Sequence, residues 1–250
     1  MSETTTKLTA DDYSYRLPDH WVLEKAEVKT HFPIMHDAYV SRAVDIIKNT
    51  GARTVIEVGC GDGWNCNKLV QAGLNVVGID WSRNAIAYAS ILVPDAQFYC
   101  GDLRDPEFLE RFPQPFDAVV FIEVIEHIPP EDCVNVLRNI SASLKKGGVL
   151  VLTTPSVNLP NTNSQHYRHF DETTLRELIS EVGGLEITSI EGYGDVPCQT
   201  KLYRKLRWVQ NRYYTIKPIA RKLLDGYKKC CLDRPLNRCA GFILKIEKLN

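Results

Sequence analysis

The sequence predicts an α/β fold with a seven-stranded, mostly parallel sheet that carries helices on both faces. Short apolar or β-branched runs alternate with helix-like segments, and this order indicates right-handed crossovers between parallel strands. Two of the runs, FDAVVFIEV and GGVLVLTT, are apolar almost throughout, as expected for strands buried on both faces. With 250 residues, of which 44% are hydrophobic and 24% charged, the chain is long enough to bury a sizeable core.

The individual elements follow in chain order. The expected strands are residues 54–58, 75–80, 97–100, 117–124, 149–154, 185–193 and 241–249. The helices expected between them are residues 64–72, 82–92, 130–144 and 171–182. Asp171 is a suitable N-cap for the last of these helices. Lys145 and Lys146, followed by two glycines, indicate the end of the helix before them.

Composition excludes several classes of protein. The hydrophobic and charged fractions are not those of a disordered or collagen-like chain, and no run of 18 apolar residues predicts a transmembrane helix. The first residues, MSETTTKLTADDYSYR, lack the apolar core of a secretory signal. The eight cysteines form no C-x-x-C pair and no zinc-binding spacing. We therefore expect reduced thiols and a cytoplasmic location.

A basic segment stands out against a mildly acidic chain. Between Lys201 and Arg238 twelve Lys/Arg oppose two acids, so this segment carries +10 and the rest of the chain −11. Pro218 is expected to separate two amphipathic helices here. The segment could be a lid, a peripheral membrane contact or a surface for an acidic partner, and its charge favours an anionic partner. A solvated helix face is the alternative, and the lack of an RNA-binding module makes nucleic acid a less favoured partner.

The most specific motif is the glycine-rich turn after the first expected strand, VIEVGCGDGWN. Gly59, Gly61 and Gly63 allow backbone conformations and close ligand approach that a Cβ would block. The spacing G-x-G-x-G differs from the dinucleotide fingerprint G-x-G-x-x-G, and no Gly-Lys-Ser/Thr of a P-loop follows. The motif contains Glu57 and Asp62 but no lysine, which predicts a cationic or zwitterionic ligand rather than a phosphate.

Acidic residues also end or follow the next two strands. Asp80 ends VVGID, where an acid can accept hydrogen bonds from both ribose hydroxyls. Asp102 follows the third strand in YCGDL, beside Leu103, where it can meet the edge of an adenine. Together with the glycine turn, these residues predict a site for an adenosine that carries a positively charged tail and no phosphate.

Five ordered motifs, E-V-G-C-G-D-G, V-V-G-I-D, G-D-L, F-D-A-V-V and L-K-K-G-G-V-L-V-L-T-T-P, resemble the class I S-adenosylmethionine-dependent methyltransferases. The resemblance covers roughly residues 55–193 and implies a Rossmann-like fold, S-adenosyl-L-methionine as cofactor and methyl transfer as activity. It also implies which residues meet the cofactor: Glu57, Gly59, Cys60 and Gly61 at its methionine end, Asp80 at the ribose, Trp81, Asp102 and Leu103 at the adenine, and Glu123 near the reacting methyl group.

This resemblance suggests how the chain is divided. We expect an N-terminal helical cap over residues 1–50, a cofactor-binding methyltransferase core over 51–196, a basic helical insertion over 197–240 and the last strand of the core over 241–250. A segment before the first strand often caps the substrate pocket in such folds. The aromatic and histidine residues that could do so are Tyr13, Tyr15, His20, Trp21, His31 and His36.

A cluster of acids and a histidine follows the fourth expected strand in FIEVIEHIPP. Glu123, Glu126 and His127 share one face if the chain turns helically there. They could hold a divalent metal such as Mg²⁺, completed by His166 or His169, that lowers the pKa of a substrate hydroxyl. By resemblance, ubiquinone-pathway O-methyltransferases and small-RNA 3′-end 2′-O-methyltransferases carry an E-x-x-E-H of this kind. The alternative is that these residues only form hydrogen bonds near the cofactor.

The stretch QHYRHF resembles the substrate side of small-molecule, lipid and sugar methyltransferases. His127, His166 and His169 are therefore candidate catalytic residues together with Glu123, because a neutral imidazole can accept a hydroxyl proton at physiological pH. Capping or packing is the alternative role for each histidine. We expect O-methylation of a small or carrier-linked, anionic substrate of the sugar, glycan or lipid type. RNA-end 2′-O-methylation, small-molecule N-methylation and an inactive cofactor-binding scaffold are the alternatives.

Overall fold

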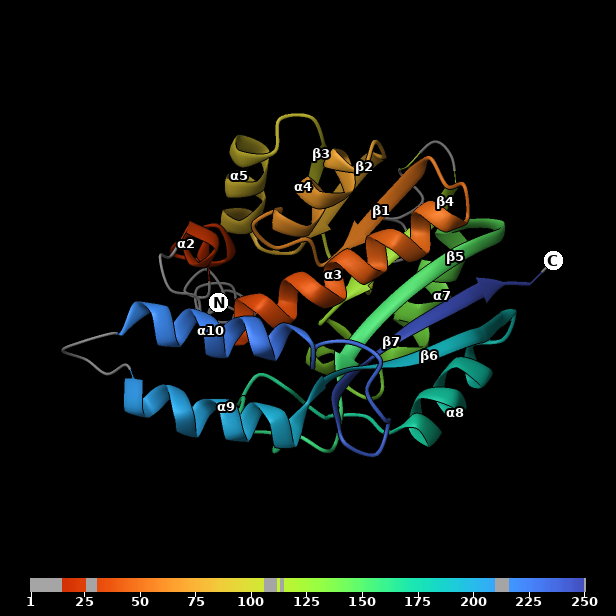
Figure 1. The fold of residues 1–250 in the computed structure, drawn as a ribbon. Coiled ribbons are helices and arrows are strands. Elements are labelled where there is room, and N and C mark those ends of the chain that lie inside the picture. Colours follow the sequence, from red (N-terminus) through yellow and green to blue (C-terminus); the bar gives the residue numbers. More distant parts are fainter. Residues whose placement is uncertain (1–14, 26–30, 106–111, 113–114, 210–215, 250) are drawn as a thin grey trace, which may run out of the picture.

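The central sheet has seven strands in the order β3-β2-β1-β4-β5-β7-β6 (Figure 1). The computed structural model describes residues 15–25, 31–105, 112, 115–209 and 216–249. The strands are β1 (Thr54–Val58), β2 (Asn75–Asp80), β3 (Gln97–Cys100), β4 (Phe116–Ile122), β5 (Leu144–Pro155), β6 (Leu185–Asp195) and β7 (Cys239–Lys248). Strand β7 runs antiparallel to β5 and β6, and the other pairings are parallel. The predicted fold class is confirmed.

Helices cover both faces of this sheet. The helical elements are α2 (Asp19–Lys25), α3 (His31–Asn49), α4 (Trp64–Gln71), α5 (Arg83–Leu92), the 3₁₀ turn η1 (Ile125–His127), α7 (Cys133–Ser143), α8 (Glu172–Val182), α9 (Val196–Val209) and α10 (Lys217–Lys228). Val120 packs in the cluster with α3 and α4, whereas Val119 packs in the cluster with α7 and α8. Because neighbouring strand residues point to opposite faces, a strand covered on both faces is apolar throughout.

The local signals at helix ends were correct in some places and wrong in others. The Asp171 carboxylate accepts a hydrogen bond of 2.7 Å from the Thr174 amide, which confirms it as the N-cap of α8. The expected helix over 130–144 is shorter, because a turn follows Pro129 and α7 begins at Cys133. Its last expected residue, Leu144, already belongs to β5, where it pairs with Phe116 of β4.

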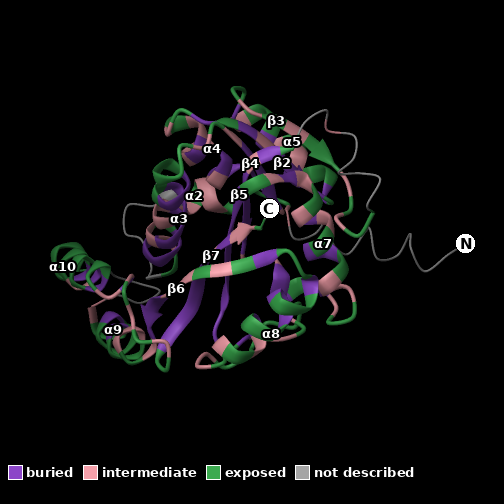
Figure 2. Ribbon diagram, turned by 90° about the vertical axis from the view of Figure 1, so that its right-hand side faces the viewer, coloured by how far each residue is buried: buried purple, intermediate pink, exposed green. Residues whose placement is uncertain are grey.

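Helices α9 and α10 form an antiparallel hairpin that projects beyond the sheet (Figures 1 and 2). The Ile216 amide donates to the Val209 carbonyl over 2.8 Å, which joins the two helices at their outer ends. At the other end Tyr227 donates to the Met35 sulfur, so α10 packs against α3. No helix in the described part of the chain is long and apolar enough to cross a membrane. All eight cysteines carry free thiols.

Candidate active site

A cavity of about 310 Å³ lies where the carboxyl ends of β1, β4 and β5 meet the N-terminal helices. Ligand sites in open α/β sheets form at this edge, because the loops that follow parallel strands converge there. The cavity brings together several predicted site residues from separate parts of the chain: Gly59, Cys60, Gly61, Glu123, Glu126, His127 and His166. Residues that the sequence did not single out complete its wall: Tyr39, Trp64, Asn65, Ile122 and Asn163.

The glycine turn after β1 is shaped for close packing. Gly59 has a φ of 76°, and a Cβ there would lie 2.4 Å from a methyl carbon of Val124. The Gly61 amide donates to one Asp80 oxygen over 2.9 Å, and the Ser82 amide donates to the other over 2.8 Å. Burial raises the pKa of Asp80. These contacts hold the carboxylate at the end of β2 and leave each oxygen a further lone pair for ribose hydroxyls.

Glu57 acts through a neighbour rather than lining the cavity itself. Its two oxygens accept hydrogen bonds from Asn65 Nδ2 at 2.8 Å and from Cys66 Sγ at 2.9 Å, and burial raises its pKa to about 7. Asn65 lines the cavity, and its Oδ1 is buried with no hydrogen-bond partner among the described residues. A buried acceptor without a partner is rare in proteins and indicates a ligand donor at that point. An ammonium group fits it.

The predicted adenine side lies outside this cavity, at the ends of β2 and β3. Pairing of Asp80 with Cys100 brings these two strand ends together. Trp81 is 45% exposed, and Leu103 is half-buried. Burial opposes ionisation of Asp102, but the hydrogen bonds from Arg104, the shortest 2.6 Å, lower its pKa. Trp81, Asp102 and Leu103 therefore border the expected adenosine position from the open edge of the sheet.

Two acids follow β4 in the cavity, Glu126 buried and Glu123 partly exposed. Glu123 has a left-handed φ of 53°, so it does not share a helix face with Glu126 as expected. One Glu123 oxygen accepts hydrogen bonds from Thr153 Oγ1 at 2.8 Å and from Tyr193 OH at 2.9 Å, while burial raises its pKa to about 7. Thr154 donates to Glu126 Oε2, whereas Glu126 Oε1 has no hydrogen-bond partner in the described structure. Burial and the nearby Glu123 charge raise the pKa of Glu126 well above its usual value.

Backbone carbonyls fix the tautomers of the three candidate histidines. His169 Nδ1 lies 3.1 Å from the Leu159 carbonyl, so this nitrogen donates and its Nε2 accepts. His166 Nδ1, 3.1 Å from that Nε2, is then the donor. His127 Nδ1 donates to the Gln165 carbonyl over 3.2 Å. His127 and His166 therefore keep a free lone pair on Nε2, while His169 orients His166 from behind.

The rings of His127 and His166 lie close to the Glu126 carboxyl group. One ligand atom from each of Glu126, His127 and His166 lies within 4.8 Å of the others. Burial lowers the pKa of His127, and burial together with the neighbouring histidines lowers that of His166 to about 4. Both rings are thus neutral at physiological pH. The structure groups His166 with Glu126 and His127, whereas Glu123, which the sequence included in the metal set, is held by Thr153 and Tyr193.

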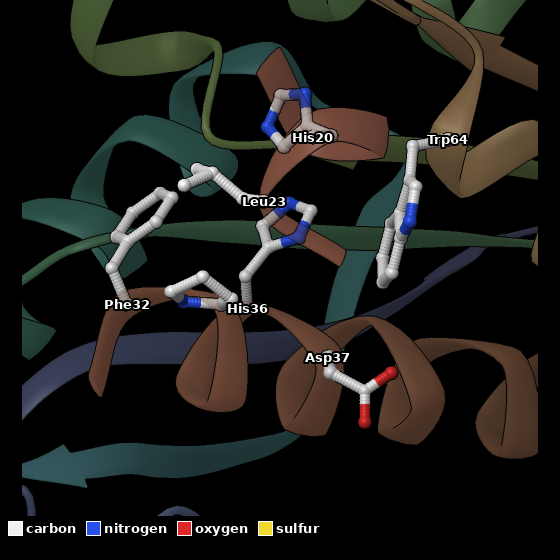
Figure 3. A pocket seen from close by; sticks show the side chains of 7 residues that line it. His20, Leu23, Phe32, His36, Asp37 and Trp64 are labelled. Carbon is white, nitrogen blue, oxygen red and sulfur yellow. The ribbon is translucent and has the colours of Figure 1, made fainter. Parts of the chain in front are cut away.

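Helices α2 and α3 cover the mouth of the cavity. Figure 3 shows His20 and Leu23 of α2 near Phe32 and His36 of α3, with the Trp64 ring beside them. The rings of His20 and His36 stack with centroids 4.8 Å apart. Of the N-terminal residues named from the sequence, Tyr15, His20 and His36 line the cavity. Tyr13 and the side chain of His31 lie outside the described residues.

Hydrogen bonds tie α2 to the glycine turn. His20 Nδ1 lies 3.2 Å from the Asp62 carboxylate, and Trp21 Nε1 donates to the Asp62 carbonyl over 3.1 Å. Burial lowers the pKa of His20, but the interaction with Asp62 outweighs it and raises the pKa above the usual value. Burial lowers the pKa of His36 well below it. The cover therefore places on Asp62 a ring whose protonated form is favoured, with a neutral ring behind it.

Comparison with known proteins identifies the family. The family described as "Methyltransferase domain" matches residues 35–190. A ubiquinone biosynthesis O-methyltransferase of Pseudomonas paraeruginosa is 30% identical over 148 residues, which are 54% of this chain and 63% of that protein. The chain thus matches less than two thirds of that relative's length.

Solved structures show the same fold at low identity. A SAM-dependent methyltransferase from Archaeoglobus fulgidus superposes with a TM-score of 0.62 at 18% identity, over 88% of this chain and 95% of that one. The small RNA methyltransferase HEN1 gives 0.59 at 16% identity, over 86% of this chain and 25% of that one. With a family match over more than half of its length, the chain belongs to the methyltransferase-domain family, and it shares its fold with S-adenosylmethionine-dependent methyltransferases.

Proposed function

We propose that this methyltransferase methylates an oxygen atom of a small or carrier-linked substrate bound in the cavity. The observation that carries the proposal is the grouping of Glu126, His127 and His166 beside the glycine turn, with one ligand atom from each within 4.8 Å of the others. A hydroxyl nucleophile needs an acceptor for its proton, and this group of atoms supplies one. The curated relative, a ubiquinone biosynthesis O-methyltransferase, supports oxygen as the acceptor atom.

The protein's main task in this reaction is alignment. S-adenosylmethionine, held by Asp80 and the glycine turn, would supply the methyl group to the substrate oxygen and would leave as the neutral thioether, and the hydroxyl proton would pass to a histidine Nε2. The sulfonium already activates the methyl group, so the wall of the cavity has to place the two reacting atoms in line. We assign proton acceptance to His166 or His127, and we assign orientation of His166 to His169, with which it shares a hydrogen bond.

We also propose that this site can hold a divalent metal ion beside the substrate hydroxyl. The donor set fits one, because Glu126 Oε1 is buried without a partner in the described structure and two imidazoles offer lone pairs beside it. Imidazole nitrogens suit zinc, iron or nickel better than Mg²⁺. When bound, such an ion would lower the pKa of the substrate hydroxyl.

RNA-end 2′-O-methylation is the second candidate. It is favoured by the same cluster of Glu126, His127 and His166, together with the structural likeness to the small RNA methyltransferase HEN1. Because the identity is 16%, this likeness supports the fold alone, and the methyl-transfer experiment below tests whether RNA is the substrate. N-methylation of a small molecule is the third candidate, since the acceptor atoms of the cavity do not by themselves select oxygen.

Calorimetric titration with S-adenosylmethionine and S-adenosylhomocysteine tests the cofactor site. Asp80→Ala removes the carboxylate proposed to bind both ribose hydroxyls, so its affinity should fall by roughly 10- to 100-fold, as expected for hydrogen bonds to a charged group. Asp95→Ala, which changes an exposed acid after α5, should bind like the wild type. Absence of binding by the wild type would overturn the cofactor assignment.

Transfer of a labelled methyl group to extract fractions then identifies the acceptor. We expect a small or carrier-linked product with an O-methyl group by mass spectrometry, unaffected by nuclease and lost with His166→Ala. Label retained in RNA and removed by nuclease would replace the proposal with the RNA-end alternative. Inhibition by a chelator, reversed by an added divalent ion, would support the metal.

A further inference from the structure

The hairpin of α9 and α10 carries a strong positive charge. The two helices contain a single acid, Asp225, and eight basic residues: Lys201, Arg204, Lys205, Arg207, Lys217, Arg221, Lys222 and Lys228. Lys228 forms a 3.9 Å ion pair with Asp225 of the same helix. All eight basic residues are exposed. The charge is therefore available to an anionic partner.

The apolar faces of both helices are already buried in the protein. Leu202 and Leu206 of α9, with Leu224 and Tyr227 of α10, belong to the core cluster that includes α3. The hairpin is thus a folded appendage with an internal core and a basic outer surface. Figure 2 shows this surface as the exposed outer side of the two helices.

Exposed apolar side chains gather at the far end of the hairpin, which we call the tip (Trp208, Ile216 and Ile219). Trp208 is 83% exposed, and Ile216 and Ile219 are 44% and 46% exposed. The hydrogen bond from the Ile216 amide to the Val209 carbonyl places the two helix ends together. An exposed indole flanked by aliphatic side chains is unusual on a protein surface and marks an interaction site.

We propose that the α9–α10 hairpin docks on an anionic lipid surface, with the tip entering the interface and the basic residues facing lipid phosphates. Tryptophan favours the interface between water and lipid, and Lys/Arg next to it are attracted by the negative surface potential of anionic lipids. RNA is less favoured, because two of the three tip residues, Ile216 and Ile219, are aliphatic, so that only Trp208 offers a π face on which a base could stack.

The docking surface is joined to the active site through α3. Tyr227 of α10 and Gln199 of α9 both donate hydrogen bonds to the Met35 sulfur, over 3.5 Å and 3.0 Å. Met35 precedes His36, which lines the cavity. In Figure 1 the outer end of the hairpin and α2, which covers the cavity mouth, lie on the same side of the molecule. A bilayer at the tip would therefore lie on the side of the molecule where α2 covers the cavity.

Co-sedimentation of the 250-residue chain with vesicles tests this proposal. Vesicles of phosphatidylcholine alone are compared with vesicles that also contain phosphatidylglycerol, at low and high salt. We expect binding to the anionic vesicles, weakened by salt, and little binding to the neutral ones. Arg204→Glu combined with Lys222→Glu should weaken binding at least tenfold. Lys146→Glu, which changes an exposed lysine on β5 outside the hairpin, should not weaken it.

The apolar tip is tested separately from the charge. Trp208→Ser should weaken vesicle binding several-fold and abolish any blue shift of the tryptophan emission on binding. Ile91→Ser, at a residue 76% exposed on α5, is the matched control. Unchanged calorimetric affinity for S-adenosylhomocysteine shows that each variant is folded.

Three outcomes would overturn the proposal. They are absence of wild-type binding to anionic vesicles, binding that the double charge reversal leaves unchanged, and displacement of the protein from vesicles by an RNA oligonucleotide that the charge-reversed variant no longer binds. The last outcome would reassign the hairpin to RNA. None of these outcomes bears on the cofactor site, so the proposed methyl transfer stands or falls separately.

Discussion

Asn65 offers the cofactor a hydrogen-bond acceptor that none of the sequence motifs predicted. Its Nδ2 is held by Glu57, which turns Oδ1 toward the cavity without a partner among the described residues. If the ammonium group of the methionine tail occupies that position, Asn65→Ala should weaken S-adenosylmethionine binding roughly 10- to 100-fold, since hydrogen bonds to charged groups contribute about 1.5–3 kcal/mol. Asn67→Ala on the same helix is the control. Equal losses in the two variants would show that helix stability, rather than the Oδ1 contact, is measured.

Glu123 should make cofactor binding depend on pH. Burial raises its pKa to about 7, so the carboxyl is mostly protonated at pH 6 and mostly ionised at pH 8. A sulfonium cation in the cavity favours the ionised form, whereas the neutral thioether of S-adenosylhomocysteine does not. The ratio of the two affinities should therefore shift toward S-adenosylmethionine by up to about tenfold between pH 6 and pH 8.

Titration calorimetry at several pH values measures this ratio. Glu123→Gln can still accept the hydrogen bonds from Thr153 and Tyr193, but it cannot ionise, so its ratio should be constant over the same range. A ratio that still rises in the variant would assign the effect to another group, with the neighbouring Glu126 the first candidate.

The turn between β1 and α4 shows how an element fixes the position of the site. Gly59 and Gly73 have similar left-handed φ values, 76° and 85°, but a Cβ at Gly59 would strike Val124, whereas one at Gly73 has nothing within 4 Å. Gly73→Ala should therefore lower the free energy of unfolding by about 1–2 kcal/mol through backbone strain alone. Gly59→Ala should cost about 1–3 kcal/mol more and reduce cofactor affinity.

Chemical denaturation of both variants, with cofactor titration alongside, checks this difference. If the two substitutions cost the same and both keep cofactor affinity, the contact between the turn and Val124 does not position the cofactor site.

Among the helices and strands, the sequence predicted the features that depend on neighbouring residues. It failed for the segment whose conformation depends on contacts with distant residues. The apolar strands, the Asp171 cap and the break before Pro218 follow from nearby residues, and all three are present. The segment after β4 could not be predicted, because the left-handed conformation of Glu123 accompanies its hydrogen bonds to Thr153 and Tyr193. Those partners lie 30 and 70 residues away in the chain.

Over the whole molecule, the sequence motifs predicted the part of the site at the carboxyl ends of the strands. They did not predict how α2 and α3 cover it. The carboxyl-end rule for parallel strands could have found Thr153 and Thr154, which end β5 beside the two acids. Tyr193, which donates to Glu123, carried no sequence signal, and nothing in the sequence separated His20 and His36 from the other N-terminal candidates, because the places of these residues depend on long-range packing. The degree to which the site is closed therefore depends on contacts between residues that are far apart in the sequence.

Closure by α2 leads to a prediction about cofactor release. The contacts of His20 Nδ1 and Trp21 Nε1 with Asp62 hold α2 over the glycine turn. Cofactor that leaves on the α2 side of the cavity has to break these contacts, so their strength should then appear in the dissociation rate. The double variant His20→Ala, Trp21→Phe keeps an aromatic ring at Trp21 and removes both side-chain hydrogen bonds.

Each such bond contributes about 0.5–1.5 kcal/mol, so the variant should release S-adenosylhomocysteine roughly tenfold faster. Stopped-flow displacement measures this rate, and Val22→Ser, at a residue on α2 that is 53% exposed, serves as the control. An unchanged rate in the double variant would mean that cofactor leaves along the open edge near Trp81 and Asp102, without movement of α2. A tenfold increase would make α2 the gate of the active site, and binding of substrate would then have to precede its closure.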